Sequence, residues 1–317
     1  MEKIKLGIST CLLGKKVRYN GGHTLDRFLA EVLGQYVEYV PVCPEVEIGL
    51  SIPREALRLV TVEGYESPRL LTQKTGIDYT GRMLNWAKIR LDQLEKEKLC
   101  GYIFKSKSPS SGMARIKVYN EKGVPTRKGV GIFAGAFMER FPLLPVEEEG
   151  RLQDIGLREN FIVRVFTCHR WRKVLDGPQT VGAVVDFHTR NKLLFMAHNP
   201  ETARQMGKLT ARAKDMPIEQ FFNSYQSLMM TCIKYKATVS KNANVLYHMI
   251  GYFKKRLEPD EKQELIETIE NYRLGYFPLV VPLTLVKHYV RKYDQSYLKE
   301  QYYLDPHPVE LKLRNHA

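Results

Sequence analysis

Two cysteines stand at the ends of predicted strands and are well suited to metal chemistry. Cys11 follows the apolar run IKLGIS at residues 4–9, and Cys43 follows VEYVPV at residues 37–42 and precedes Glu45 by two positions. Thiolates are the preferred ligands of iron–sulfur centres. Because no CxxC pair is present, two cysteines packed in a core are the alternative. The pattern therefore indicates a metal or cluster site shared by two loops.

A third apolar run, GYIFK at residues 101–105, leads into the serine-rich segment SKSPSSGMAR. Helical patterns at residues 24–34 and 78–98 fall between the three runs, which favours a parallel α/β sheet. The carboxyl ends of parallel strands meet at one edge, where open sheets bind ligands. We therefore expect the three loops to form one site.

Two glycine-containing segments do not fit nucleotide-binding motifs. GISTCLLGKK has the wrong spacing for a phosphate loop and lacks the final Ser or Thr, and GVGIFAG is not a GxGxxG fingerprint. The sequence thus gives no nucleotide-binding motif.

The chain has 317 residues and is 44% hydrophobic, which is enough for two domains with separate cores. Prolines and an acidic run near residue 145 predict a linker at residues 146–155. We expect an α/β parallel-sheet (Rossmann-like) domain at residues 1–145. The patterns after the linker, including EPDEKQELIETIENYRLG, are helical, so residues 156–317 are predicted to be all-α.

The formal net charge is +14. Such a balance favours a polyanionic partner such as RNA, or an anionic membrane surface, over a neutral one. A generally basic soluble protein is the plainer interpretation. No long apolar segment or signal peptide is evident, so we expect a cytoplasmic protein. Five cysteines do not suggest a disulfide framework.

Three sequence blocks of the first half resemble, in order, the signature blocks of the thiouracil desulfidase family. They are GISTCLLGKKVRYNGGH at 7–23, VCPEVEIGLSIPRE at 42–55 and KSKSPSSGMARIKVY at 105–119. The resemblance implies a [4Fe-4S] cluster held by three cysteines, with one iron open to the sulfur of a thiolated pyrimidine. Sulfur would leave the base and an oxygen from water would replace it.

The second half resembles the YbgA-like helical domain. The similarity lies in VVDFHTRNKLLFMAH at 184–198, NVLYHMIGYFKKRL at 244–257 and YRLGYFPLVVPLTLVKHYV at 272–290. Fusions of the two domains are similar to bacterial tRNA 4-thiouridine desulfidases. The implied substrate is 4-thiouridine in tRNA, or a free thiolated pyrimidine nucleoside.

Carried onto this sequence, the resemblance implies cluster ligands at Cys11 and Cys43 and a catalytic carboxylate at Glu45. Ser108 would be its hydrogen-bonding partner. Without the resemblance, Glu45 reads as a carboxylate that stabilises a helix start, and Ser108 as a turn residue.

Ser111 departs from the family pattern, which has SPSCG where this chain has SPSSG. A hydroxyl is far less acidic than a thiol and is a poor ligand for a soft metal. Three explanations stay open: a natural enzyme whose third ligand is the Ser111 oxygen or another group, an artificial substitution, and a homologue that lost catalysis and kept RNA binding. The remaining cysteines are expected to pack in the interior: Cys100, Cys168 and Cys232.

Polar residues in the first two loops are candidates for substrate binding. Arg18, Asn20 and His23 follow the first ligand position, and Arg54 follows the second, where they could hold the polar edges of a nucleoside or a phosphate. A simple turn role is the alternative for His23.

Basic residues recur along the C-terminal half, where the resemblance implies tRNA binding. Cations engage phosphates, and nearby tyrosines could stack on exposed bases. Solvated helix faces and core tyrosines are the alternative. The positions predicted to contact RNA are Arg190, Lys192, Lys254, Lys255, Lys287 and Arg291.

Overall fold

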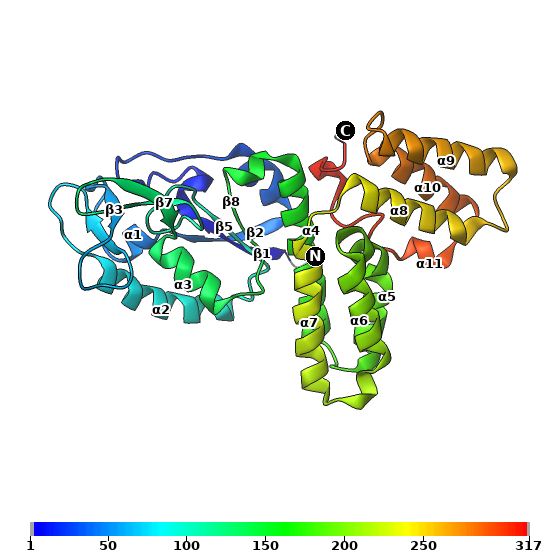
Figure 1. The fold of residues 1–317 in the computed structure, drawn as a ribbon, viewed down its shortest axis with the longest axis horizontal. Coiled ribbons are helices and arrows are strands. Elements are labelled where there is room, and N and C mark those ends of the chain that lie inside the picture. Colours follow the sequence, from blue (N-terminus) through cyan, green and yellow to red (C-terminus); the bar gives the residue numbers. More distant parts are fainter. Residues whose placement is uncertain (1–2, 316–317) are drawn as a thin grey trace. The chain divides into compact units, whose positions relative to one another are not determined.

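The apolar runs of the first half form parallel strands, as predicted. Strands β1 (Ile4–Ser9), β2 (Val37–Val42), β5 (Tyr102–Phe104) and β8 (Val146–Glu148) make one sheet in the order β2-β1-β5-β8, and every pairing is parallel. The computed structural model describes residues 3–315. It divides into two units, residues 1–153 and 154–317, and Figure 1 traces the elements of each.

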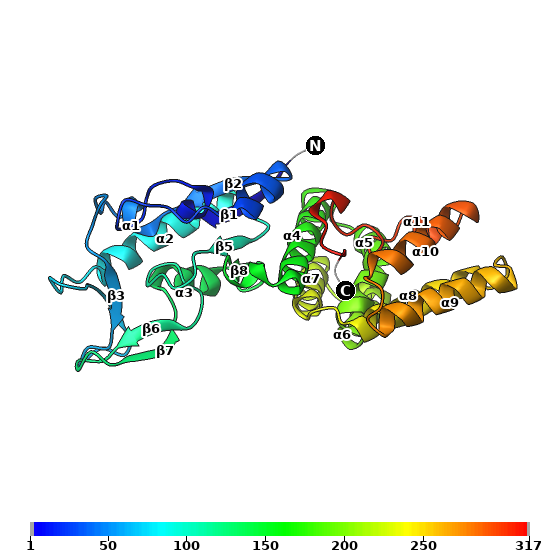
Figure 2. The ribbon, with the colours of Figure 1, turned by 90° about the horizontal axis from the view of Figure 1, so that it is seen from above.

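A second, smaller sheet in the N-terminal unit was not expected from the sequence. It contains β3 (Leu57–Val60), β4 (Arg69–Thr72), β6 (Ile116–Tyr119) and β7 (Pro125–Gly129) in the order β4-β3-β6-β7. Strands β3 and β6 are parallel, and the outer pairings are antiparallel. Each strand has only four or five residues, which is too short for a clear alternating pattern. Figure 2 shows β3, β6 and β7 to one side of the first sheet.

Helices complete the N-terminal unit. The pattern at 78–98 forms α2 (Thr80–Lys96), whose buried apolar side chains include Met83, Ala87 and Leu91 at intervals of four residues, as an amphipathic helix requires. The pattern at 24–34 instead gives a π-helical turn at Phe28–Val32 followed by a 3-10 turn at Leu33–Gln35. Two further helices are α1 (Pro44–Glu47) and α3 (Ile132–Arg140).

The segment expected to be a linker, residues 146–155, contains strand β8, a 3-10 turn at Arg151–Gln153 and the first residue of α4. Two of its acidic side chains, Glu147 and Glu148, are buried rather than solvated. Glu147 accepts a hydrogen bond from Arg151 at 2.7 Å, and Glu148 accepts one from the backbone of Met113 at 2.8 Å. These partners explain how an acidic run can lie in a folded unit.

The second unit is built of helices and has no strand among its described residues, as predicted. Its helices are α4 (Ile155–Asp176), α5 (Val181–His198), α6 (Pro200–Ala211), α7 (Ile218–Lys234), α8 (Val239–Ile250), α9 (Pro259–Arg273), α10 (Val280–Lys292) and α11 (Ser296–Lys299). Asp154, Thr180, Asn199 and Thr238 cap the first residues of α4, α5, α6 and α8. Cys168 and Cys232 are buried here, and Cys100 is buried in the first unit, as expected.

Buried histidines support the packing of the helical unit. His198 Nδ1 lies 2.7 Å from the Tyr235 carbonyl oxygen, and His188 Nδ1 lies 3.1 Å from the Tyr225 hydroxyl. Burial lowers the pKa of each imidazole to about 4. Both histidines therefore act as neutral hydrogen-bonding residues. Between residues 3 and 315, no helix is long and apolar enough to cross a bilayer.

Candidate active site

The two predicted ligand cysteines lie at the same edge of the first sheet. Cys11 sits in a 3-10 turn directly after β1, and the turn ends at Gly14 with a left-handed backbone. Cys43 follows β2, and its backbone N–H donates to Glu47 in α1 at 3.0 Å. Because β1 and β2 are neighbouring parallel strands, the two thiols line one cavity of about 420 Å³. We call it the cysteine cavity.

Both thiols are held in their protonated form by the protein alone. Burial raises the pKa of Cys11, against smaller opposing effects of a Thr24 hydrogen bond and the Lys105 charge. Burial, followed by the negative charge of Glu45, raises the pKa of Cys43 to about 12. A metal cation that bound these sulfurs would therefore have to displace protons.

Glu45 and two serines form a hydrogen-bonded chain beside Cys43. Glu45 Oε2 lies 3.7 Å from Cys43 Sγ, and its Oε1 accepts a hydrogen bond of 2.5 Å from the Ser110 hydroxyl. The hydroxyls of Ser110 and Ser108 lie 2.9 Å apart. Ser108 is thus connected to Glu45 through Ser110. The sequence reasoning passed over Ser110, although it is the middle serine of the SPSSG block.

Ser111 lies in the wall of the cysteine cavity and is only 3% exposed. Its backbone N–H donates to the Ser108 hydroxyl at 3.1 Å. Within the described residues, no three His, Cys, Asp or Glu side chains gather as a metal site. The donors available beside Cys11 and Cys43 are oxygens, and the Ser111 hydroxyl is one of them. Two of the three side chains that would hold a cluster here are thiols, which suit iron, and the third is a hydroxyl, which suits it less well.

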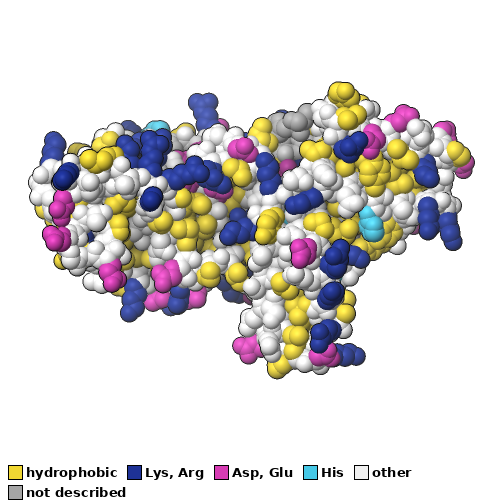
Figure 3. All heavy atoms as spheres, in the orientation of Figure 1, with side chains coloured by type: hydrophobic (Ala, Val, Ile, Leu, Met, Phe, Trp, Pro, Cys, Tyr) yellow, Lys and Arg dark blue, Asp and Glu magenta, His cyan; other side chains and the backbone are white. Residues whose placement is uncertain are grey.

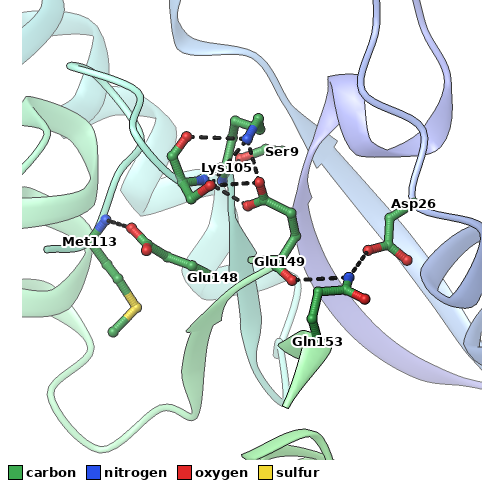
Figure 4. A network of polar contacts seen from close by, with 8 residues as sticks. Ser9, Asp26, Lys105, Met113, Glu148, Glu149 and Gln153 are labelled. Carbon is green, nitrogen blue, oxygen red and sulfur yellow. Dashed lines mark hydrogen bonds and ion pairs between the residues drawn. The ribbon is translucent and has the colours of Figure 1, made fainter. Parts of the chain in front are cut away.

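The serine-rich loop is tied to the sheet by a polar network, shown in Figure 4. The backbone N–H of Lys105 donates to the Ser9 hydroxyl at 2.9 Å, and the backbone N–H of Ser106 donates to Glu149 at 2.6 Å. The Lys105 ammonium also pairs with Glu149. Ser9 ends β1 and Glu149 follows β8, so two strands fix the start of the loop. No sequence motif marks Glu149, which stands only as part of an acidic run.

The GVGIFAG segment contains Gly131, which lies close to the backbone of the serine loop. It precedes α3, and a Cβ atom there would lie 2.6 Å from the Ser110 carbonyl carbon and oxygen. The backbone N–H of Gly131 donates to Gly112 at 2.7 Å, and that of Phe133 donates to Ser110 at 2.9 Å. The glycine allows a close backbone approach that positions the serine loop.

The predicted substrate-binding residues divide into two groups. Arg18 and Arg54 line the cysteine cavity. Arg54 Nη1 donates to the Val17 carbonyl at 3.0 Å, and Arg54 Nη2 lies 3.9 Å from Glu45 Oε2. Asn20 and His23 do not line this cavity; each accepts a hydrogen bond from a backbone N–H two residues further on. Their roles in substrate binding stay predictions.

Two of the predicted RNA-binding cations of the helical unit are held in ion pairs. Arg190 pairs with Asp186 and Glu300, and Lys287 pairs with Asp305. The remaining four are exposed and form no ion pair within residues 3–315: Lys192, Lys254, Lys255 and Arg291. These four are the cations best available to a phosphate.

Comparison with known proteins identifies both halves of the chain. The 2-thiouracil desulfurase family matches residues 6–149, and DUF1722, a protein family of unknown function, matches residues 192–308. The uncharacterized protein YbgA of Escherichia coli (strain K12) is 30% identical over 158 residues, which is 50% of this chain and 94% of YbgA. The chain belongs to the family of YbgA, and its first half is similar to 2-thiouracil desulfurases.

Two further proteins are similar to part of this chain. The uncharacterized protein YbbK of Bacillus subtilis (strain 168) is 28% identical over 113 residues, covering 34% of this chain and 74% of YbbK. A solved structure described as the [4Fe-4S]-dependent thiouracil desulfidase TudS is 29% identical, covers 49% of this chain and 97% of its own, and has a TM-score of 0.39.

Proposed function

We propose that this protein converts 4-thiouridine in tRNA to uridine, in the cytoplasm. One observation carries the chemistry: the two thiols, Ser111 and the Glu45–Ser110–Ser108 chain belong to one cavity and its walls. The net charge of +14 supports a polyanionic substrate over a free base or nucleoside.

The reaction exchanges the thiocarbonyl sulfur of the base for an oxygen atom from water. The carbon–sulfur bond breaks, a carbon–oxygen bond forms, and sulfur leaves as hydrogen sulfide, with no net oxidation or reduction. A [4Fe-4S] cluster held by Cys11, Cys43 and Ser111 would supply Lewis-acid polarisation of the carbon–sulfur bond and accept the sulfide.

Glu45 is the residue of this chain that would take the proton of the attacking water. Its carboxylate lies beside Cys43, and Ser110 and Arg54 fix its orientation from two sides. A general base held in this way contributes about 10²–10⁴-fold to a rate. Because the Ser110 hydroxyl donates its one hydrogen to Glu45, the Ser108 hydroxyl donates to Ser110 and supports the Glu45 carboxylate through it.

Ser111 favours a second candidate, an RNA-binding homologue without catalysis. A hydroxyl does not match a thiolate in affinity for iron. In this case the cavity would keep its shape and lose the tightly held cluster.

Anaerobic reconstitution with iron and sulfide separates the two candidates. The chain and its Ser111→Cys variant are compared for bound iron, visible cluster absorbance and loss of 4-thiouridine from tRNA, with Ser111→Ala as the control that removes the hydroxyl. Activity of the unmodified chain, lost in Ser111→Ala, supports the desulfidase with an oxygen ligand. Activity in Ser111→Cys alone supports the silent homologue. Inactivity of every protein, with the cluster present, would rule out desulfidation.

A further inference from the structure

A second cavity, of about 850 Å³, adjoins the cysteine cavity in the N-terminal unit. Leu57, Gln73, Ser106, Lys107 and Pro109 line both spaces, so the two are continuous neighbours. The larger one lies against strands β3, β6 and β7 of the second sheet. We call it the basic cavity because six cationic side chains line it: Arg58, Lys107, Arg115, Lys117, Arg127 and Arg151.

Most of this positive charge is not neutralised by the protein. Apart from Arg151, which binds Glu147, these cations form no ion pair with any carboxylate in residues 3–315. The Arg58 Nε atom is buried without a hydrogen-bond partner. The acidic residue in the lining is Glu148, and it already accepts the backbone N–H of Met113. A cavity with this imbalance attracts an anion.

Two cationic residues of the serine loop have an unusual backbone conformation. Lys107 and Arg115 bracket the SPSSG block, and both have left-handed backbones, with φ of 59° and 56°. This conformation is uncommon for residues with a Cβ atom, because the Cβ atom crowds the backbone there. The loop thus holds two exposed cations beside the two cavities in a conformation that folding alone does not favour.

An aromatic ring accompanies the cations. Tyr119 lines the basic cavity, and the guanidinium carbon of Arg58 lies 5.6 Å from the centre of its ring. Sites that bind single-stranded nucleic acids commonly combine cations with an aromatic side chain. The phosphates bind the cations, and a base stacks on the ring. Figure 3 shows Lys and Arg side chains gathered on the upper part of the N-terminal unit.

We propose that the basic cavity binds the RNA strand next to the thiolated nucleotide, with phosphates on Arg58, Lys117 and Arg127 and a neighbouring base on Tyr119. The inference rests on the proposed function and specifies its substrate: a nucleotide within a strand, opened from its helix, with the thiolated base in the cysteine cavity. RNA recognition would then lie in the catalytic unit as well as in the helical one.

The test measures binding of a short single-stranded RNA containing one 4-thiouridine to the full chain, by fluorescence anisotropy across a range of salt concentrations. The variant is Arg58→Gln/Arg127→Gln. The control is Lys128→Gln, which removes an exposed cation next to Arg127 on β7 that does not line the cavity. We expect about tenfold weaker binding and a salt slope reduced by about 1.4 for the two lost phosphate contacts, with the control unchanged.

Further outcomes separate this proposal from desulfidation itself. Equal affinity and salt slope in the double variant and in Lys128→Gln would overturn the proposal. Displacement of the labelled RNA by poly-glutamate or by anionic lipid vesicles as effectively as by unlabelled RNA would also overturn it. Reconstituted enzyme should lose efficiency on the RNA and keep it on free 4-thiouridine; a parallel loss on both substrates would also overturn it. If the reconstituted unmodified chain is inactive on both substrates, the proposed function is contradicted, while the binding result still decides this inference.

Discussion

Glu45 is the residue on which the proposed chemistry depends most directly. Glu45→Gln keeps an oxygen that can accept the Ser110 hydrogen bond and removes the basic carboxylate. We expect the desulfidation rate to fall by about 10²–10⁴-fold with bound iron unchanged. Single-turnover assays on thiolated RNA and iron analysis provide the two measurements. An unaltered rate would show that another group takes the proton.

Ser110 tests whether the hydrogen-bonded chain has a role of its own. Ser110→Ala breaks the link between Glu45 and Ser108. A hydrogen bond to a charged group stabilises by about 1.5–3 kcal/mol, so we expect at least a tenfold slower reaction. Ser51→Ala, which removes an exposed serine of the same unit, is the control. If both variants react at the normal rate, Ser110 is a structural residue only.

Under the proposed function, the identity of residue 111 determines how firmly the cluster iron is held. Ser111→Cys should slow the loss of iron to a chelator by about tenfold or more. Substitutions at and around metal ligands typically change metal affinity by at least that factor. The measurement is the decay of cluster absorbance after reconstitution. Equal decay in both proteins would mean that residue 111 is not a ligand.

At the scale of elements, the buried histidines make the helical unit sensitive to acid. The pKa of His198 falls from 6.5 to about 4 on folding, so between these values the unfolded chain binds the proton more readily. Stability is therefore kept above pH 6.5 and is lost as the pH falls toward 4. This one histidine contributes a loss of about 2 kcal/mol between pH 7 and pH 5.

Denaturant unfolding at pH 7 and pH 5 measures this loss. His198→Asn should be less stable than the unmodified chain at pH 7 and should show a smaller decrease on acidification. His288→Asn, which removes an exposed histidine on α10, is the control. A His198 variant that keeps the full decrease would assign it to other groups.

Some strands could be predicted from the local sequence pattern, and others could not. The runs at 4–9 and 37–42 were strong enough to predict β1 and β2, because strands buried in a parallel sheet are continuously apolar. Strands β3, β4, β6 and β7 were missed because each is short and only partly buried. The basic cavity lies against that missed sheet, so it could not be inferred from sequence.

At the scale of the whole molecule, two pairs of cations in the helical unit should differ in their effect on tRNA binding. Lys254→Gln/Lys255→Gln removes exposed cations without an ion pair, whereas Arg190→Gln/Lys287→Gln removes an equal charge that acidic neighbours already engage. We expect the first variant to lower tRNA affinity and the salt slope more, the slope by about 1.8 if both contact duplex phosphates. Titration at several salt concentrations measures both. Identical behaviour would indicate that overall charge, and not these contacts, governs binding.

The sequence by itself determined the two-part organisation and the main chemical groups of the site. Apolar runs and helical periods are local properties, and so are the signature blocks, of which the first two carry Cys11, Cys43 and Glu45 and the third carries Ser108 and Ser111. Tertiary structure decided how these groups meet. Ser110 links Glu45 to Ser108 because α3 fixes the loop backbone, and Glu149 anchors the loop because β8 pairs with β5. Such contacts join residues far apart in the chain, and no local pattern encodes them.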